Sequence, residues 1–103
     1  MSVPEWFLDL AQAELSLAAT RVGLRIFRTG TRAVDEGGNP IIRCQIPLRR
    51  LAKLTGLDEK GVLRGLSELE GKAGLARHRP LRARAAAAYC LPVLTTGNLP
   101  LVK

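Results

Sequence analysis

Apolar residues recur at helical spacing in two segments near the start of the chain. The first begins where Ser2 and Glu5 have the spacing of a capping box, and it contains Val3, Trp6, Phe7 and Leu10. The second is a longer amphipathic segment from Ser16, a suitable N-cap, to about Thr29, and Gly30 ends it. These patterns predict two helices that pack their apolar sides into a core.

The pattern changes after the second helix. Residues 31–40 are rich in Gly, Asn, Asp and Pro, which predicts a loop. Residues 41–46 then alternate, with Ile42, Cys44 and Ile46 separated by polar residues, as in a strand buried on one face. Pro47 ends this strand.

Two further amphipathic segments, 48–55 and 58–70, are separated by a short turn. Gly56 permits the turn conformation, Asp58 can cap the second helix, and the small Ala52 allows the two helices to approach closely. The core-facing residues of the pair are Leu48, Leu51, Leu54, Val62, Leu66 and Leu69. This arrangement is typical of a helix-turn-helix, and it also occurs in helix pairs that bind only protein.

Residues 75–91 allow two interpretations. The alanine run favours a helix, whereas its position between Pro80 and Pro92 favours a hairpin. We expect the hairpin, with strands at 75–77 and about 85–91 and a charged turn between them, followed by a tail over 93–103. The order of elements predicts a single α+β domain over residues 1–92 with a winged helix-turn-helix fold.

Three segments resemble the N-terminal winged-helix domains of plasmid and phage replication initiators, and more broadly bacterial winged-helix regulators. They are VPEWFLDLAQAELSLAATRVGLRIFRTG, IPLRRLAKLTGLDEKGVLRGLSELEGKAGLA and YCLP. The resemblance implies binding of double-stranded DNA in replication initiation or copy control, or as a transcriptional repressor. Positions 61 and 63, often small polar residues in that family, are Gly61 and Leu63 here. An exposed Leu63 is also consistent with a winged-helix module that binds another protein.

The charge pattern supports a polyanionic partner. Sixteen Lys and Arg against nine Asp and Glu give a net charge of +7, and no acidic residue follows Glu70. Solubility is the alternative reason for such a surface. The predicted DNA-binding residues lie on the two short helices and the hairpin: Arg49, Arg50, Lys53, Lys60, Arg64, Ser67, Arg77, Arg79, Arg82 and Arg84.

A second basic pattern lies on the long helix. Arg21, Arg25, Arg28 and Arg32 fall at i, i+4, i+7 and i+11, so we expect all four to project from one narrow edge of that helix. The stripe is compatible with a solvated face, a phosphate contact or an acidic partner.

Other function classes have little support in the sequence. The single histidine, His78, lies among arginines, which argues against a general base, so we expect no enzyme activity. Neither Cys44 nor Cys90 belongs to a pair with metal-ligand spacing, so we expect no metal and no cofactor. No secretory signal or membrane-spanning run is present, which predicts a cytoplasmic protein. One recognition helix per domain favours a homodimer, or several copies on repeated sites, and the first helix with its aromatic residues is a candidate interface.

Overall fold

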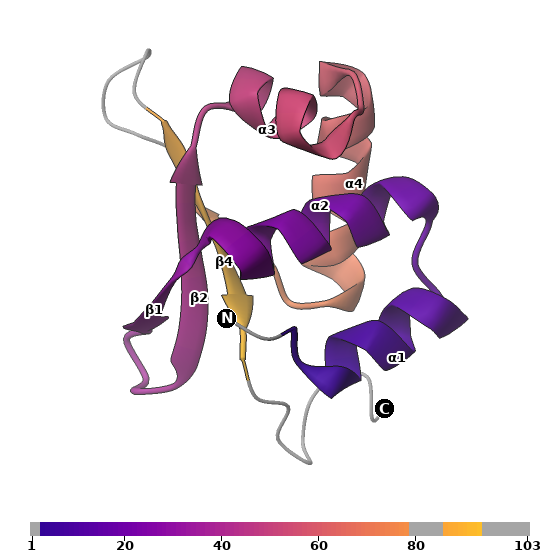
Figure 1. Cartoon of the computed structure of the whole chain (residues 1–103). Helices are drawn as coiled ribbons and strands as arrows, with labels where there is room; N and C mark the ends of the chain where they lie inside the picture. Colours follow the sequence, from indigo (N-terminus) through magenta and orange to yellow (C-terminus); the bar gives the residue numbers. More distant parts are fainter. Residues whose placement is uncertain (1–2, 79–85, 94–103) are drawn as a thin grey trace.

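The chain folds into an α+β structure with four helices and a small antiparallel sheet of four strands (Figure 1). The computed structural model describes residues 3–78 and 86–93. The elements, in chain order, are α1 (Glu5–Ala13), α2 (Leu17–Thr29), β1 (Thr31–Val34), β2 (Pro40–Ile46), α3 (Leu48–Thr55), α4 (Glu59–Lys72), β3 (Ala76–His78) and β4 (Ala87–Pro92).

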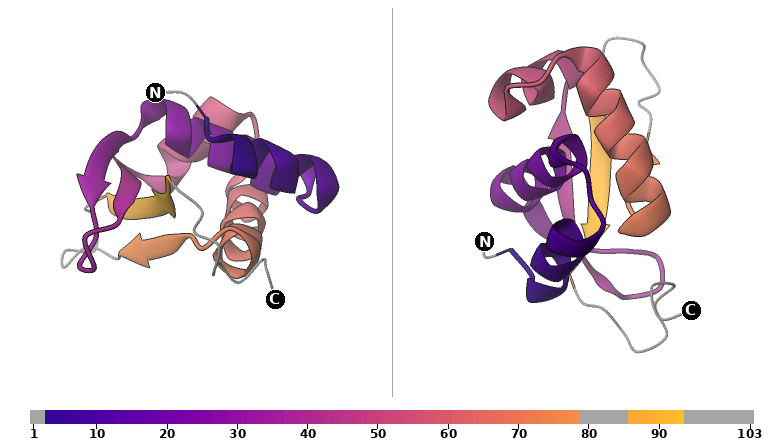
Figure 2. Two further views of the ribbon diagram at one scale, coloured as in Figure 1. Left: turned by 90° about the horizontal axis from the view of Figure 1, so that it is seen from below. Right: turned by 90° about the vertical axis from the view of Figure 1, so that its right-hand side faces the viewer.

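The sheet has the order β1-β2-β4-β3, and α1 and α2 lie on one side of it (Figure 2). In β2, Ile42, Cys44 and Ile46 are buried, while the residues between them are exposed, so the predicted alternation is confirmed. Cys44 is paired with Tyr89 of β4, which belongs to the same buried cluster. The core therefore fills the space between this face of the sheet and the helices.

The aromatic residues of α1 are part of this core. Phe7 is fully buried, and its ring lies 5.1 Å from that of Phe27 on α2 in an edge-to-face arrangement. Trp6 packs on both rings and donates its indole N–H to the Val93 carbonyl at 2.9 Å. The aromatic side chains thus hold α1 to α2 and to the end of β4, and Phe7 has no exposed surface left for the predicted dimer interface.

The start of α1 differs from the prediction. The helix begins at Glu5, and its N-cap position is taken by Pro4, which makes no side-chain capping bond. Ser2, the predicted cap, lies outside the described residues. By contrast, the predicted cap of α2 is confirmed, because the Ser16 hydroxyl accepts a hydrogen bond from the Ala19 amide at 3.2 Å.

The predicted loop over residues 31–40 is wrong in its first part. Thr31–Val34 forms β1, which pairs with β2, and Asp35 closes the hairpin by accepting hydrogen bonds from the Gly37 and Asn39 amides. The turn-forming residues at 35–40 dominate the composition of segment 31–40, so the sequence pattern does not reveal the short strand before them. Arg32 consequently lies in β1, not on the helix edge predicted for the arginine stripe.

The turn between α3 and α4 forms as predicted. Gly56 has a φ of 76°, in the left-handed region that favours glycine, and the Asp58 carboxylate accepts from the Gly61 amide at 2.7 Å. The second helix runs beyond the predicted end at residue 70, to Lys72, and Gly74, with a φ of 76°, follows it. A helix, a tight turn and a second helix are therefore present where the sequence predicts them.

The described residues confirm a hairpin, which the sequence favours over a helix for the alanine-rich segment. β3 pairs antiparallel with β4, with Arg77 opposite Tyr89. The strand bounds are shifted by one or two residues from those predicted. Residues 79–85, which contain most of the predicted charged turn, and the tail beyond residue 93 lie outside the described residues.

The close packing of α2 on α4 depends on one glycine and one carboxylate. A side chain at Gly65 would come within 3.0 Å of the Ala18 carbonyl oxygen, so the helices cross at a point without a side chain. Close by, Glu68 accepts the Ser16 amide at 2.7 Å, and Lys72 donates to the Glu14 carbonyl at 3.0 Å. These bonds fix the linker between α1 and α2 to α4.

The Glu68 contact predicts a stability that falls in acid. The Ser16 amide holds the pKa of Glu68 below its ordinary value of 4.5. The folded chain therefore favours the ionised carboxylate. The stability that this bond contributes is fully present when the pH is above the ordinary pKa, and it is lost as the pH falls through the lowered pKa of the folded state. Urea unfolding of the native chain and of Glu68→Gln between pH 7 and pH 3 checks this: the native chain should lose more stability than the variant. Parallel losses would show that the bond contributes nothing.

Candidate nucleic-acid interface

Three of the predicted DNA-binding residues lie together on α3. Arg49, Arg50 and Lys53 are exposed, and with Pro47 they line a surface hollow of about 360 Å³. The helix contains no acidic residue, because its sequence is LRRLAKLT, and its opposite side buries Leu51 and Ala52. Packing of that apolar side on the core therefore points the three cations to solvent as one group, and such a group matches the oxygens of a phosphate backbone.

The exposed side of α4 is more mixed in charge. Lys60 and Arg64 are exposed one turn apart, with Ser67 a further turn along. Leu63 lies among them with 42% of its surface exposed, and Glu59 occupies the first turn. Asp58 fixes the start of this helix and Val62, Leu66 and Leu69 bury its other side, so this set of side chains is held on a rigid element.

Arg77 of β3 is engaged with α4. Its Nε donates to Glu70 Oε2 at 2.6 Å, its Nη2 to Glu70 Oε1 at 3.0 Å and also to Ser67 Oγ at 3.5 Å. This bidentate pair lowers the pKa of Glu70. Arg77 and Ser67 were both predicted to contact DNA, and their contacts here connect the base of the hairpin to the side of α4.

The remaining predicted contacts, Arg79, Arg82 and Arg84, lie outside the described residues. The structure accordingly brings together the cations of α3 and, separately, those of α4, and it holds the side chain of Arg77, from β3, against α4. The buried apolar sides of α3 and α4 determine where these cationic side chains lie.

The arginines of α2 adjoin the end of α3. Arg25 donates to the Leu54 carbonyl at 3.2 Å and so satisfies a group of the last turn of that helix, where cations are favoured. A side chain at Gly56 would come within 3.8 Å of Arg21 Nη1. The sequence did not predict the Arg25 contact, because spacing within one helix carries no information about a carbonyl on another.

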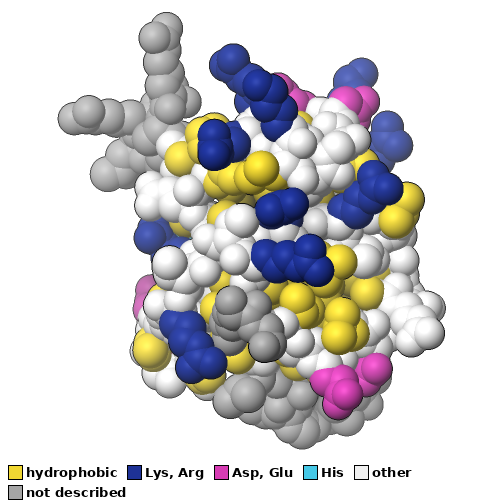
Figure 3. Space-filling model, viewed as in Figure 1, with side chains coloured by type: hydrophobic (Ala, Val, Ile, Leu, Met, Phe, Trp, Pro, Cys, Tyr) yellow, Lys and Arg dark blue, Asp and Glu magenta, His cyan; other side chains and the backbone are white. Residues whose placement is uncertain are grey.

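Lys and Arg side chains are prominent over α2 and α3 on the face of the molecule shown in Figure 3. The two helices contribute Arg21, Arg25, Arg28, Arg49, Arg50 and Lys53, and neither contains an acidic residue. On α4, by contrast, Lys60 and Arg64 are accompanied by Glu59, and Glu70 is paired with Arg77. The described cations are thus most concentrated on α2 and α3.

Neither a metal site nor a membrane span is found in the described part of the chain. No group of three or more His, Cys, Asp or Glu side chains there is placed to hold a metal ion, and no helix there is long and apolar enough to cross a membrane. Cys44 and Cys90 project from opposite faces of the sheet, since Cys44 pairs with Tyr89 and Cys90 with Arg43. Burial raises the pKa of the Cys90 thiol.

Comparison with known proteins gives no relative: no family model, no curated protein and no solved structure matches the chain.

Proposed function

We propose that this protein is a winged helix-turn-helix domain that binds double-stranded DNA. The observation that carries the proposal is the pair α3 and α4, joined at the left-handed Gly56 and each presenting cations on its exposed side. The pairing of β3 with β4 directly after α4 is the arrangement expected of a wing. The net charge of +7 supports a polyanionic ligand.

In this proposal α4 is the recognition helix and lies in the major groove. Lys60 and Arg64 would face the base edges, and Arg64 is suited to guanine because a guanidinium reaches both O6 and N7. Leu63 between them would meet a thymine methyl group. Glu59 in the first turn is suited to a cytosine amino group and poorly suited to a phosphate.

The cations of α3 would bind the DNA backbone beside this groove. Arg49, Arg50 and Lys53 share one hollow, so one stretch of phosphates can contact all three. Contacts of this kind set the register of the protein on the duplex without reading its sequence. Arg79, Arg82 and Arg84 are proposed as further backbone contacts from the wing, on their sequence alone.

The experiment that tests this division of roles compares Arg64→Gln with Arg50→Gln. Binding sites are first selected from random duplex DNA, and affinities are then measured on a selected and on a random duplex. Arg64→Gln should cost about 1–3 kcal/mol on the selected site and little on the random one. Arg50→Gln should weaken both alike and reduce the slope of log affinity against log salt by about 0.9. If both variants weaken both duplexes equally, α4 is not in the groove.

The biological process proposed for this DNA binding is replication initiation or copy control of a plasmid or phage, with transcriptional repression as the alternative. Both rest on the resemblance of the sequence. Either process would need two copies on a two-fold site or several copies on repeats, because one short recognition helix gives limited affinity.

A second candidate function is binding to another protein through α4. It is favoured by the 42% exposure of Leu63 at the centre of that helix face, where a DNA-reading helix more often has a polar residue. Replacing Leu63 by serine separates the two functions. Affinity for a random duplex should change little if α4 reads DNA, with a loss only on selected sites that place a thymine at Leu63, whereas a protein contact centred on Leu63 would be lost.

A further inference from the structure

β1 forms an outer edge of the sheet, and no described strand pairs with its far side (Figure 1). Such an edge presents main-chain N–H and C=O groups that can pair with another strand. Three of its residues are exposed: Thr31, Arg32 and Val34. The 66% exposure of Val34 is high for a β-branched apolar side chain, and it marks this edge as incompletely covered.

The hydrogen-bond pattern of the hairpin fixes which backbone groups are free. The Asp35 amide donates to the Asn39 carbonyl at 3.0 Å, so residues 35 and 39 form a hydrogen-bonded pair. Hydrogen-bonded and non-hydrogen-bonded pairs alternate along an antiparallel ladder. Ala33 and Ile41 therefore form the next hydrogen-bonded pair, and Val34 and Pro40 between them form a non-hydrogen-bonded pair. Pro40, which has no N–H, fits this assignment. The backbone groups of Arg32 and Val34 therefore point away from β2.

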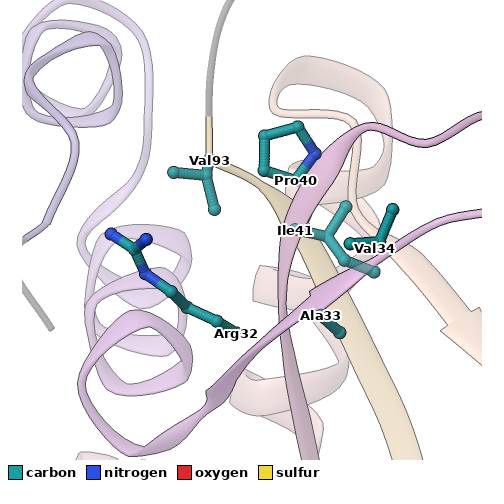
Figure 4. Close-up of a pocket in the computed structure, with 6 residues that line it drawn as sticks. All are labelled: Arg32, Ala33, Val34, Pro40, Ile41 and Val93. Atoms are coloured by element: carbon teal, nitrogen blue, oxygen red, sulfur yellow. The ribbon is translucent and has the colours of Figure 1, made fainter.

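A hollow of about 250 Å³ lies beside this edge (Figure 4). It is mainly apolar, and its walls include Val34, Pro40, Val93 and Arg32. Arg32 and Val34 lie on the same face of β1, because alternate residues share a face. A strand added along β1 would place its own side chains at the rim of this hollow.

We propose that a second copy of this chain pairs its β1 with β1 of the first, antiparallel about a two-fold axis at Ala33. In this register Arg32 of each copy pairs with Val34 of the other, so every outward backbone group of both residues is used. A register shifted toward the helix would need the Gly30 amide, which already donates to the Ile26 carbonyl at 2.8 Å. A shift the other way would need Glu36, which lies in the turn.

Side chains and charges fit the same register. Ala33 faces its own copy at the axis, where side chains are closest and a small one is needed. The Val34 side chain of each copy lies over the aliphatic part of Arg32 of the other copy, at the rim of that other copy's hollow. The antiparallel orientation also brings Arg32 toward the acidic turn of its partner, where Asp35 and Glu36 are exposed, whereas a parallel pairing would oppose like charges.

The pairing is expected to be weak for an isolated pair of chains. A strand this short contributes far less than the roughly 800 Å² per partner that stable complexes bury. Two copies held close together would pair much more readily, because their effective concentration is then in the millimolar range. If the proposed DNA binding is correct, two adjacent half-sites would supply that proximity.

Cross-linking through Ala33→Cys tests the proposal on the full chain, without DNA. Across the axis the two Cα atoms would lie about 4.5 Å apart, within the range of a disulfide, so mild oxidation should give a covalent dimer roughly tenfold faster than in a control. The control is Ala13→Cys, at the exposed end of α1. The native Cys44 and Cys90 are buried, and the native chain provides their background rate.

A second substitution separates strand pairing from chance collision. Val34→Pro removes an N–H that points away from β2, so the hairpin should remain, as circular dichroism can verify. Added to Ala33→Cys, it should return the cross-linking rate to that of the control. Equal rates for the cysteines at 33 and 13, or a rate unaffected by proline, would overturn the proposal. Since the assay contains no DNA, its failure leaves the proposed function untouched.

Discussion

Removal of the three α3 cations is expected to weaken binding to any duplex by roughly 10²-fold at 0.2 M salt, because each lost phosphate contact removes about 0.9 from the slope of log affinity against log salt. The variant is Arg49→Ala/Arg50→Ala/Lys53→Ala. These side chains are exposed and line one hollow, so their loss should leave the fold intact. Fluorescence anisotropy with a labelled random duplex measures the effect.

A control variant separates location from net charge. Arg28→Ala/Arg32→Ala/Arg43→Ala removes the same charge from exposed positions on α2, β1 and β2. If α3 lies against the backbone, this control should lose far less affinity than the α3 variant at equal salt. Equal losses would mean that the chain attracts DNA only through its total charge, and the interface proposed on α3 would be wrong.

The largest effect on stability is expected from Gly23→Ala. The added Cβ would lie 2.2 Å from Cζ and 2.7 Å from Cε1 of Phe7, a ring that is fully buried between α1 and α2. The ring has to move into a filled core, which should cost about 1–3 kcal/mol. Thermal and urea unfolding measure the loss, and for a chain of this size each kcal/mol lowers Tm by about 4–8 °C.

Gly71→Ala is the matched control, because it makes the same change in another helix. A Cβ there meets nothing within 4 Å, so the variant should gain up to about 1 kcal/mol from helix propensity. Adding Phe7→Leu to Gly23→Ala should recover part of the loss, since the smaller side chain leaves room, and the two effects should not be additive. Destabilisation of equal size at both glycines would contradict this account of α1 packing.

Local signals in the sequence were enough to predict most helices and strands. Ser16 and Asp58 are caps whose bonds lie within a few residues, and Gly56 takes the one conformation that its turn needs. The alternation of β2 reports burial on a single face. The two strands of the last hairpin followed from the proline positions. Each of these features depends on neighbours in the chain, so the pattern alone reveals them.

Contacts between distant residues were not predictable in this way. Arg77, counted as a free cation, is paired with Glu70, and Arg25 is bound to the Leu54 carbonyl. The sequence shows how many arginines there are, but only the packing of distant segments shows which of their guanidinium groups are bonded to other parts of the chain. β1 was missed because a strand this short shows almost no alternation, and it is recognised only by its pairing with β2. The edge proposed to join two copies depends on that strand.

The most direct test of DNA binding is the affinity of the native chain for a random-sequence duplex between 50 and 200 mM salt. With about five phosphates neutralised, the slope of log affinity against log salt should be roughly −4 to −5. A slope near zero, or no binding at 50 mM salt, would contradict the proposal that this chain is a DNA-binding protein.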